Sequence, residues 1–357
     1  SLVFVASGTE RVTAHPLTLE FIRQASRRSR RLRSVVAGRF VKVMTEYCRR
    51  YGGDDWRWGH FDLLDAELPN IWKLIEVTRR QGRDRELVEL RNLLTLFLSI
   101  RGHWDRRVEL ATAAAAAAAS PQTKARIHIY DLCYVHLKRG EIDAARVEAM
   151  TALRLLSNRA DDADLANVKR HLGRIAQESG QFEEAAQLYR ESRVLYVQSD
   201  EEYGAFLDWD LGDLAAAGGN KVLAATYFES AYFASKGRSG KSEAVHAMAA
   251  RSLGETALED DDLVRAQELL EEAHQISFAV GRADEMALSS LGLGSLWATV
   301  GEREVAIGLV TGAMMLFRQL GDRPRVDECE VLLRALRHGS AIGTDRWVAG
   351  PRGWLHG

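Results

Sequence analysis

The sequence contains few residues that interrupt a helix and few runs that predict a β-strand. Five of its 357 residues are proline, which breaks helix interiors because it lacks a backbone N–H. The longest strand-like run is residues 2–5. The chain is also longer than the ~250–300 residues at which a single core stops growing. These properties favour an all-α architecture that grows by stacking helices.

Cysteine, long apolar runs and excess charge are scarce as well. Cys48, Cys133 and Cys329 lie far apart and form no Cys-x-x-Cys pair. They predict neither a disulfide framework nor a zinc site, so we expect a reducing, cytoplasmic location. No apolar run approaches the ~20 residues that cross a bilayer, so we expect no membrane partner. The formal net charge of −2 gives no general attraction to nucleic acid.

Motifs for catalysis or cofactor binding are absent or lack their context. Residues 235–242 end in Gly-Lys-Ser like a phosphate-binding loop, but Ser235 stands where the loop requires glycine. A helix rather than a strand is expected before it. The ten histidines include no His-Glu-x-x-His pair. The sequence therefore predicts no catalytic residue, no metal and no cofactor in this chain, and a binding protein rather than an enzyme.

A repeated segment is the strongest signal in the sequence. Five copies share a Leu and a small residue, a turn residue seven positions later and an alanine five positions further. With a looser first copy, the turn residues lie 38 to 42 residues apart at Gly102, Gly140, Gly180, Gly219, Asp261 and Gly301. Each copy predicts a helical hairpin, because glycine ends a helix in the left-handed conformation and small residues let two helices approach. A lone hairpin cannot bury its apolar face, so neighbours must stack.

The Leu-Gly pair, the turn glycine and the second-helix alanine resemble the tetratricopeptide repeat. Bulky residues recur four positions after this alanine, at Tyr189, Phe228, Leu270 and Val310. The resemblance covers roughly residues 84–338 and implies a right-handed superhelical solenoid of about six hairpins. Its period exceeds the family's ~34 residues, and the family's leading Trp is missing. Residues 34–83 are then a helical linker, and residues 339–357 a Gly-rich tail.

The first 33 residues do not fit the repeat. Residues 1–5 and 11–13 predict a β-hairpin, and His15-Pro16-Leu17 precedes a predicted helix. This order resembles the end of the winged-helix domain in STAND-class signalling ATPases of the NB-ARC type. Residues 61–70 resemble the segment that precedes the repeats of that family.

This second resemblance implies a sensor of bacterial signal transduction. Its repeats would relay ligand occupancy to a switch that binds ADP or ATP in the full-length protein, with self-association on activation. His15 matches the family's phosphate-contacting histidine and is the predicted cofactor-binding residue in that context. The alternative is that His15 packs at the start of a helix.

Arginine is concentrated in a predicted helix over residues 23–33, at Arg23, Arg27, Arg28, Arg30, Arg31 and Arg33. One interpretation is the solvated face of a helix that bridges two domains. The other is contact with the phosphates of a nucleic acid. No aromatic residues alternate with these arginines for stacking on bases, so nucleic acid is the weaker hypothesis.

In the family that the repeats resemble, positions 2, 5 and 9 of each first helix face the concave groove. They correspond to Ile127, Tyr130, Tyr134, Asn167, Arg170, Arg174, Phe206, Trp209, Asp213, Met248, Arg251, Glu255, Leu288, Leu291 and Ser295. Tyr, Trp and Arg dominate binding hot spots. Arg170 and Arg174 are one turn apart, where they can grip one carboxylate or phosphate.

We therefore predict a partner-binding site for a protein or peptide. It consists of Tyr130, Tyr134, Asn167, Arg170, Arg174, Trp209, Asp213, Arg251 and Glu255. The alternative is that about half of the groove positions belong to the core or are merely solvated. At the level of function, the leading hypothesis is the sensor of a STAND-type ATPase. The alternatives are a peptide-responsive regulator or scaffold without its own ATPase, and contact with nucleic acid through residues 23–33.

Overall fold

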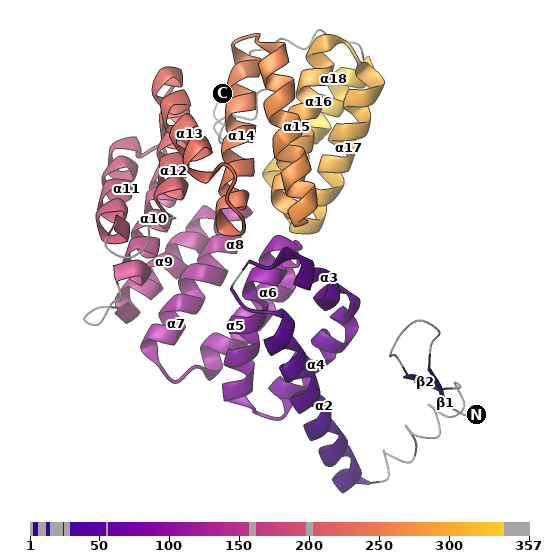
Figure 1. The fold of residues 1–357 in the computed structure, drawn as a ribbon. Helices are drawn as coiled ribbons and strands as arrows, with labels where there is room; N and C mark the ends of the chain where they lie inside the picture. Colours follow the sequence, from indigo (N-terminus) through magenta and orange to yellow (C-terminus); the bar gives the residue numbers. More distant parts are fainter. Residues whose placement is uncertain are drawn as a thin grey trace.

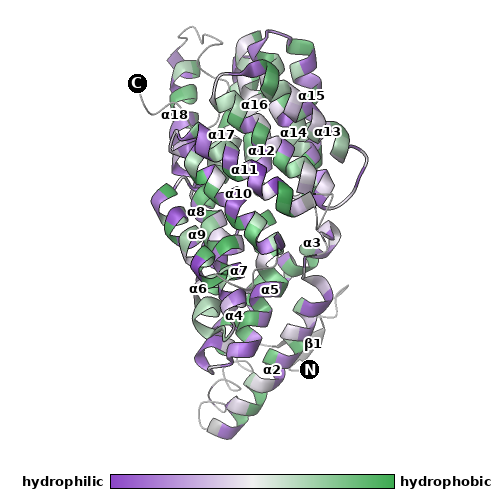
Figure 2. Cartoon of the chain, turned by 90° about the vertical axis from the view of Figure 1, so that its left-hand side faces the viewer, coloured by the Kyte–Doolittle hydropathy of each residue, from purple (hydrophilic) through white to green (hydrophobic). Residues whose placement is uncertain are grey.

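The computed structural model describes residues 3–5, 12–14, 24, 29–54, 56–156, 162–197 and 203–338. Most of these residues lie in helices, which stack as a curved array of hairpins (Figure 1). Hydrophobic and hydrophilic residues are mixed along the same helices, as expected for helices that bury one side (Figure 2). No helix of the described chain is both long and apolar enough to span a bilayer. The array confirms the predicted all-α solenoid.

The N-terminal strands confirm one prediction and the next helix corrects another. β1 (Val3–Val5) pairs antiparallel with β2 (Val12–Ala14), which confirms the predicted β-hairpin. Helix α2 (Arg30–Tyr51) begins after Ser29, whose backbone is extended and whose hydroxyl accepts a hydrogen bond from the backbone N–H of Leu32. The prediction of one arginine-rich helix over residues 23–33 is therefore wrong, because Ser29 interrupts it.

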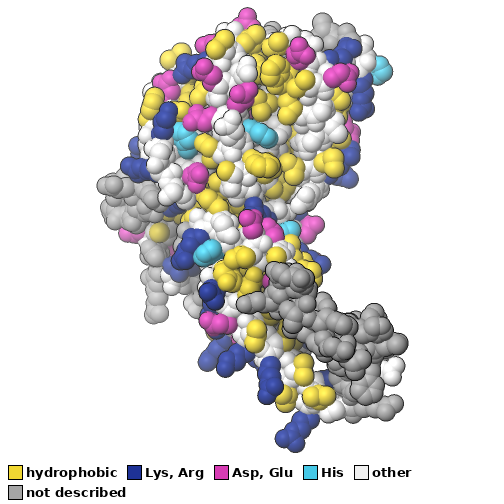
Figure 3. Space-filling model, turned by 45° about the vertical axis from the view of Figure 1, so that its right-hand side comes forward, with side chains coloured by type: hydrophobic (Ala, Val, Ile, Leu, Met, Phe, Trp, Pro, Cys, Tyr) yellow, Lys and Arg dark blue, Asp and Glu magenta, His cyan; other side chains and the backbone are white. Residues whose placement is uncertain are grey.

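Basic side chains are exposed along α2. Arg31 and Arg33 are exposed there, and Lys and Arg side chains are seen on the projecting lower end of the molecule (Figure 3). His15, Arg23, Arg27, Arg28 and residues 339–357 lie outside the described residues. What the sequence predicts for them stays a prediction.

Residues 34–83 fold into helices that share one buried core with the helices that follow. Helix α2 is followed by α3 (Trp58–Ala66) and α4 (Leu68–Arg80), with Pro69 in the first turn of α4. The three helices bury Cys48, Phe61, Leu64, Ile71 and Leu74 against the next helix, residues 84–100. The segment therefore extends the solenoid by one more helical layer.

Six hairpins follow, and each pairs a first helix with a second. They are α5 (Asp84–Ile100) with α6 (Trp104–Ala117); α7 (Pro121–Ile127), η1 (His128–Cys133) and α8 (Tyr134–Lys138) with α9 (Ile142–Leu156); α10 (Asp162–Glu178) with α11 (Phe182–Val197); α12 (Tyr203–Ala217) with α13 (Lys221–Ser235); α14 (Lys241–Glu259) with α15 (Leu263–Val280); and α16 (Ala283–Val300) with α17 (Arg303–Leu320). Helix α18 (Arg323–His338) covers the last hairpin. In the second hairpin, η1 is a π-helical segment between α7 and α8.

The turns inside the hairpins lie where the sequence predicts them. All six predicted turn residues have a left-handed backbone, with φ between +60° at Asp261 and +92° at Gly301. Asp261 is the one non-glycine residue among the six. The turn positions of the repeat are therefore confirmed.

The small residue of each first helix lies directly against the bulky residue of the second. A Cβ added to Gly212 would lie 2.6 Å from the ring of Phe228. Gly173, Gly254 and Gly294 face Tyr189, Leu270 and Val310 in the same way. In the second hairpin the sizes are reversed, because Cys133 lies in one buried cluster with Ala149. The predicted close approach of the two helices is confirmed.

The array curves until its last hairpins contact its first. Trp104 and Val135 share one buried cluster with Ala287, Leu291 and Phe317. A Cβ added to Gly102 would lie 2.8 Å from Leu320 and 3.0 Å from Ala283, so the two parts meet without a gap. Nearer the N-terminus, the indole N–H of Trp58 donates to Glu243 at 2.8 Å.

Two arginines bind across this closure. The Arg101 guanidinium donates to the carbonyl oxygens of Val280 and Gly281, at the end of α15. One hairpin later, Arg139 Nε donates to the carbonyl oxygen of Leu320 at 2.9 Å, at the end of α17. The same relation between a turn arginine and a helix end is thus repeated in the next hairpin.

We predict opposite effects for two Gly→Ala substitutions in helix interiors. Gly212→Ala forces the added methyl group against Phe228 and should lower the free energy of unfolding by about 1–3 kcal/mol. Gly308→Ala is the matched control: nothing lies within 4 Å of its Cβ position, so the better helix propensity of alanine should raise the free energy by about 1 kcal/mol. Urea unfolding followed by circular dichroism measures both. Equal effects would contradict the close approach.

Candidate ligand-binding cavity

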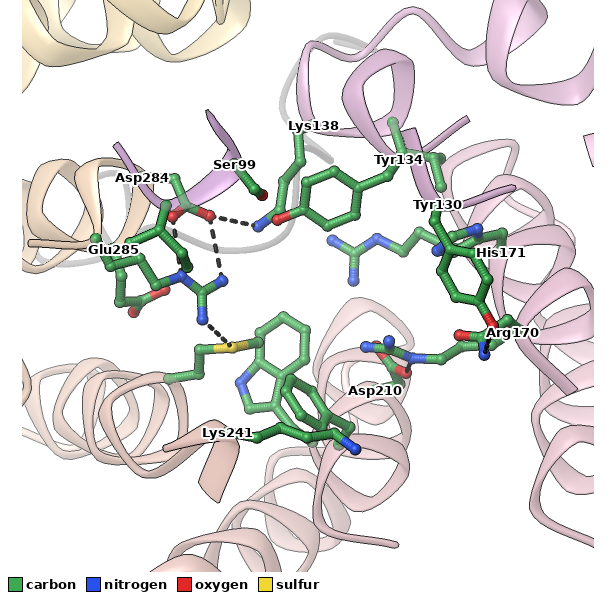
Figure 4. Close-up of a pocket in the computed structure, with 18 of the residues that line it drawn as sticks. Ser99, Tyr130, Tyr134, Lys138, Arg170, His171, Asp210, Lys241, Asp284 and Glu285 are labelled. Atoms are coloured by element: carbon green, nitrogen blue, oxygen red, sulfur yellow. Dashed lines mark hydrogen bonds and ion pairs between the residues drawn. The ribbon is translucent and has the colours of Figure 1, made fainter. Parts of the chain in front are cut away.

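The nine predicted partner-binding residues all line one cavity of about 950 Å³ on the inner side of the curved array. They come from the first helices of four successive hairpins. The closure adds residues of the first and sixth hairpins to the same lining. Figure 4 shows labelled side chains from both ends of the array directed toward the shared space. The positions of the nine residues agree with the prediction, whereas their contact with a partner stays a prediction.

Other groove predictions are wrong for three positions. Ile127, Leu291 and Ser295 do not line the cavity. They are at most 5% exposed. Ile127 packs in a buried cluster with the preceding hairpin, and Leu291 in the cluster that joins the last hairpins to the first. The structure also adds lining residues that the sequence reasoning missed, among them Arg91, Arg107, Arg126, His171, Asp210, Arg282 and Asp284.

Ion pairs between successive first helices form a ladder along the cavity. Arg91 pairs with Asp131, Arg126 with Asp164, Arg170 with Asp210 and Arg174 with Asp213. Each acid lies 38 to 40 residues after its arginine, one repeat later. This spacing of arginine and acid is visible in the sequence and could have revealed the ladder.

Arg170 and Arg174 are therefore not free cations. Arg170 makes two hydrogen bonds to Asp210, whose side chain is 4% exposed, and its Nη2 lies 3.2 Å from Asp210 Oδ1. Arg174 contacts both Asp213 and Glu178. The hypothesis that these two arginines grip a ligand carboxylate needs this correction, since each arginine is already neutralised by the protein.

Charged groups of the last hairpins are paired in the same manner. Arg251 contacts Glu255 and Glu285, and burial raises the pKa of Glu255 to about 7 although Arg251 opposes the shift. Asp284 lies between Arg282 and Lys138, with Nε of Arg282 and Nζ of Lys138 each at 2.9 Å. Burial alone would raise the pKa of Asp284, but these two cations hold it below its usual value.

Aromatic rings fill the spaces between the charged pairs. The Arg170 guanidinium lies 5.2 Å from the ring centroid of Phe206, and that of Arg107 lies 4.8 Å from the centroid of Tyr134. The indole N–H of Trp209 donates to the hydroxyl of Ser252 at 3.0 Å. Each of these three rings thus contacts a polar neighbour, so apolar surfaces lie next to polar groups in the cavity wall. This combination is typical of ligand sites.

The cysteine thiols lie outside the cavity, and the possible metal ligands of the described residues do not form a metal site. Burial raises the pKa of the Cys48, Cys133 and Cys329 thiols to about 12, and none of the three lines the cavity. Within the described residues, no group of three or more His, Cys, Asp or Glu side chains could hold a metal ion. The arrangement that the cavity offers is one of aromatic surfaces and hydrogen-bonding pairs.

Comparison with known proteins identifies the fold. No protein-family model and no curated protein matches the sequence. Among solved structures, a Rap protein complexed with competence and sporulation factor is 12% identical; the match covers 79% of this chain and 84% of that chain, with a TM-score of 0.55. The two chains therefore share a helical-repeat solenoid fold of the tetratricopeptide type.

Two further solved structures are similar at lower TM-scores. BtubC (BKLC) from P. vanneervenii is 18% identical over 60% of this chain and 91% of its own, with a TM-score of 0.45. A STAND protein with a tetratricopeptide repeat sensor from Pyrococcus horikoshii is 16% identical, with a TM-score of 0.44. That match covers 96% of this chain and 54% of the STAND protein.

The ladder predicts a stability cost for removing one of its arginines. Arg170→Ala leaves the buried carboxylate of Asp210 without its counter-ion and should lower the free energy of unfolding by about 3 kcal/mol. The matched control is Arg49→Ala, because Arg49 pairs with Glu89 at the surface and should matter little. Thermal and urea unfolding measure both. An Arg170→Ala protein as stable as the Arg49→Ala protein would show that the ladder does not stabilise the fold.

Proposed function

We propose that this chain is a sensor module that binds a peptide, or an extended segment of a protein, inside the central cavity. The observation that carries the proposal is the convergence of all nine predicted residues on one cavity closed by distant hairpins. Ligand cavities usually measure about 300–1,000 Å³. A cavity of about 950 Å³ is large for a metabolite and too small for a folded domain.

The chemistry of the lining supports a peptide ligand. Phe206, Trp209 and Tyr134 offer surfaces for apolar side chains, and aromatic residues of this kind carry much of the binding energy at interfaces. The ion pairs of the cavity supply hydrogen-bonding groups for the backbone amides of a peptide. Because the charges are paired, they do not give the cavity a strong electrostatic potential of one sign. Asn167 donates from its amide to the Tyr130 hydroxyl at 2.8 Å, which positions both groups at the cavity surface.

We further propose that occupancy of the cavity is relayed to a nucleotide-dependent switch of a STAND-type signalling ATPase. This step is supported by the sequence resemblance of residues 1–33 and 61–70 to that family. A ligand that enters the closed array must bind between hairpins that also contact each other, so it can bias how tightly the array closes. Self-association on activation and binding of ADP or ATP near His15 belong to the same proposal.

Peptide binding can be tested by selection from a random octapeptide library, followed by calorimetry with the enriched peptides. Phe206→Ala removes an aromatic surface of the cavity and should weaken binding by at least ~30-fold, as truncation at a hot spot does. The matched control is Phe233→Ala, since Phe233 is 70% exposed and does not line the cavity. Its affinity should be unchanged. No enrichment, or equal losses in the two variants, would refute binding in the cavity.

The relay is tested separately in the full-length protein. The enriched peptide should accelerate the exchange of bound ADP for ATP, and Phe206→Ala should abolish the acceleration. If the peptide binds but nucleotide exchange does not respond, the relay is refuted. A peptide-responsive regulator without its own ATPase then becomes the better hypothesis.

A further inference from the structure

One carboxylate near the cavity is shared by two arginines. Asp131 lies on the π-helical segment η1 and is fully buried. Arg91 Nε donates to its Oδ2 at 2.6 Å, and Arg107 Nε donates to its Oδ1 at 2.9 Å. The two arginine side chains are 9% and 5% exposed. Two buried positive charges thus face one buried negative charge.

This site differs from the rest of the ladder. Arg126 and Arg170 each have an acid of their own one repeat later. Among the described residues, no carboxylate other than Asp131 is in salt-bridge contact with Arg91 or Arg107. The local sum is one positive charge, and burying a charge without a counter-ion is costly.

Two polar nitrogens at this place have no hydrogen-bond partner. They are Nη1 of Arg107 and Nδ1 of His171, and both residues are more than nine-tenths buried and line the cavity. Burial, together with the charges of Arg170 and Arg107, lowers the pKa of His171 to about 3, so its imidazole is neutral at physiological pH. A neutral imidazole can donate a hydrogen bond without adding a further charge.

We propose that Arg107 and His171 form an anion subsite in the cavity wall that takes a single carboxylate. The site lies beside Tyr134, because the guanidinium of Arg107 lies over the Tyr134 ring and Lys138 lies near the same ring. The proposal deepens the proposed function, because it assigns an acidic group to the peptide in the cavity. It commits to a carboxylate because one negative charge cancels the local excess, whereas a phosphate dianion would reverse it.

Binding requires a small rearrangement that the triad allows. Both nitrogens are buried although their residues line the cavity, so Arg107 must turn toward the ligand. Asp131 then still accepts hydrogen bonds from Arg91 and from the hydroxyl of Thr95, which donates to its Oδ1 at 3.0 Å. The shared carboxylate is therefore not left unpaired when Arg107 engages the ligand.

The carboxylate has two sources in a peptide, the chain end and an acidic side chain. N-acetylglycine represents the first source, and the α-amide of N-acetylaspartate represents the second. Tighter binding of one probe assigns the source. Acetate represents the shared chemistry, and chloride at equal ionic strength controls for salt.

The experiment is an NMR titration of the whole chain with ¹⁵N-labelled histidine, in which His171→Gln assigns the His171 signals. Acetate should shift these signals and raise the pKa of His171, because a nearby anion stabilises the protonated imidazole. Chloride should not. Phosphate should bind less tightly than acetate. Arg107→Gln should weaken acetate binding by ~10–100-fold, the usual effect of losing a hydrogen bond to a charged group.

The matched control is Arg126→Gln, because Arg126 lines the same cavity but has its own acid, Asp164. It should bind acetate as the parent does. If Arg107→Gln does not fold, the titration of the unaltered chain still decides. Identical responses to acetate and chloride, or equal losses in the two variants, would overturn the subsite. If the subsite is overturned in this way, peptide binding that depends on Phe206 still supports the proposed function. If acetate binds but no peptide is enriched, the subsite stands and the proposed peptide binding is refuted.

Discussion

Arg101 and Arg139 place their guanidinium groups at the carboxyl ends of α15 and α17. The last carbonyl groups of a helix have no partner within it and carry the negative end of the helix dipole, so a cation there satisfies both. Asp62 and Asp105 hold the two arginines from the opposite side. This contact, together with the buried cluster around Trp104 and Phe317, brings residues of the first and sixth hairpins to the cavity lining.

The charges inside the cavity follow from its closure. Enclosed arginines and acids lose contact with water, and each is therefore paired with an opposite charge. The partner lies one repeat away along the ladder, whereas Arg251 also pairs with Glu255 on its own helix. Such pairs add little net stability compared with apolar packing, but they fix which groups face the cavity. Arg91 and Arg107 share Asp131, just as Arg282 and Lys138 share Asp284. The π-helical segment that carries Asp131 also carries Tyr130, so the irregular turn lies at the cavity surface.

Much of the local structure was predictable because it depends on neighbours within one repeat. Gly180 and Gly219 end helices wherever the chain must adopt a positive φ. Gly212 and Phe228 meet because a fixed turn brings residues 16 positions apart together. Ser29 escaped the prediction because an arginine-rich segment looks helical, whereas a serine that caps the next helix interrupts it. Ile127 and Leu291 also escaped it, since the tilt between hairpins decides whether a helix face is open or covered.

The sequence by itself determined the hairpins, their turns, the glycine contacts between paired helices and the side of each first helix that faces inward. These features repeat, and each is set by residues fewer than about 40 positions apart. The tertiary structure alone decided that Lys138 meets Asp284 and that Arg139 meets Leu320. The rotation from one hairpin to the next is small, and its sum over the array determines which distant helices touch. That sum turned a predicted open groove into a cavity that distant hairpins partly close. The pairing of the arginines has a more local cause, because Arg170 and Asp210 lie on successive hairpins.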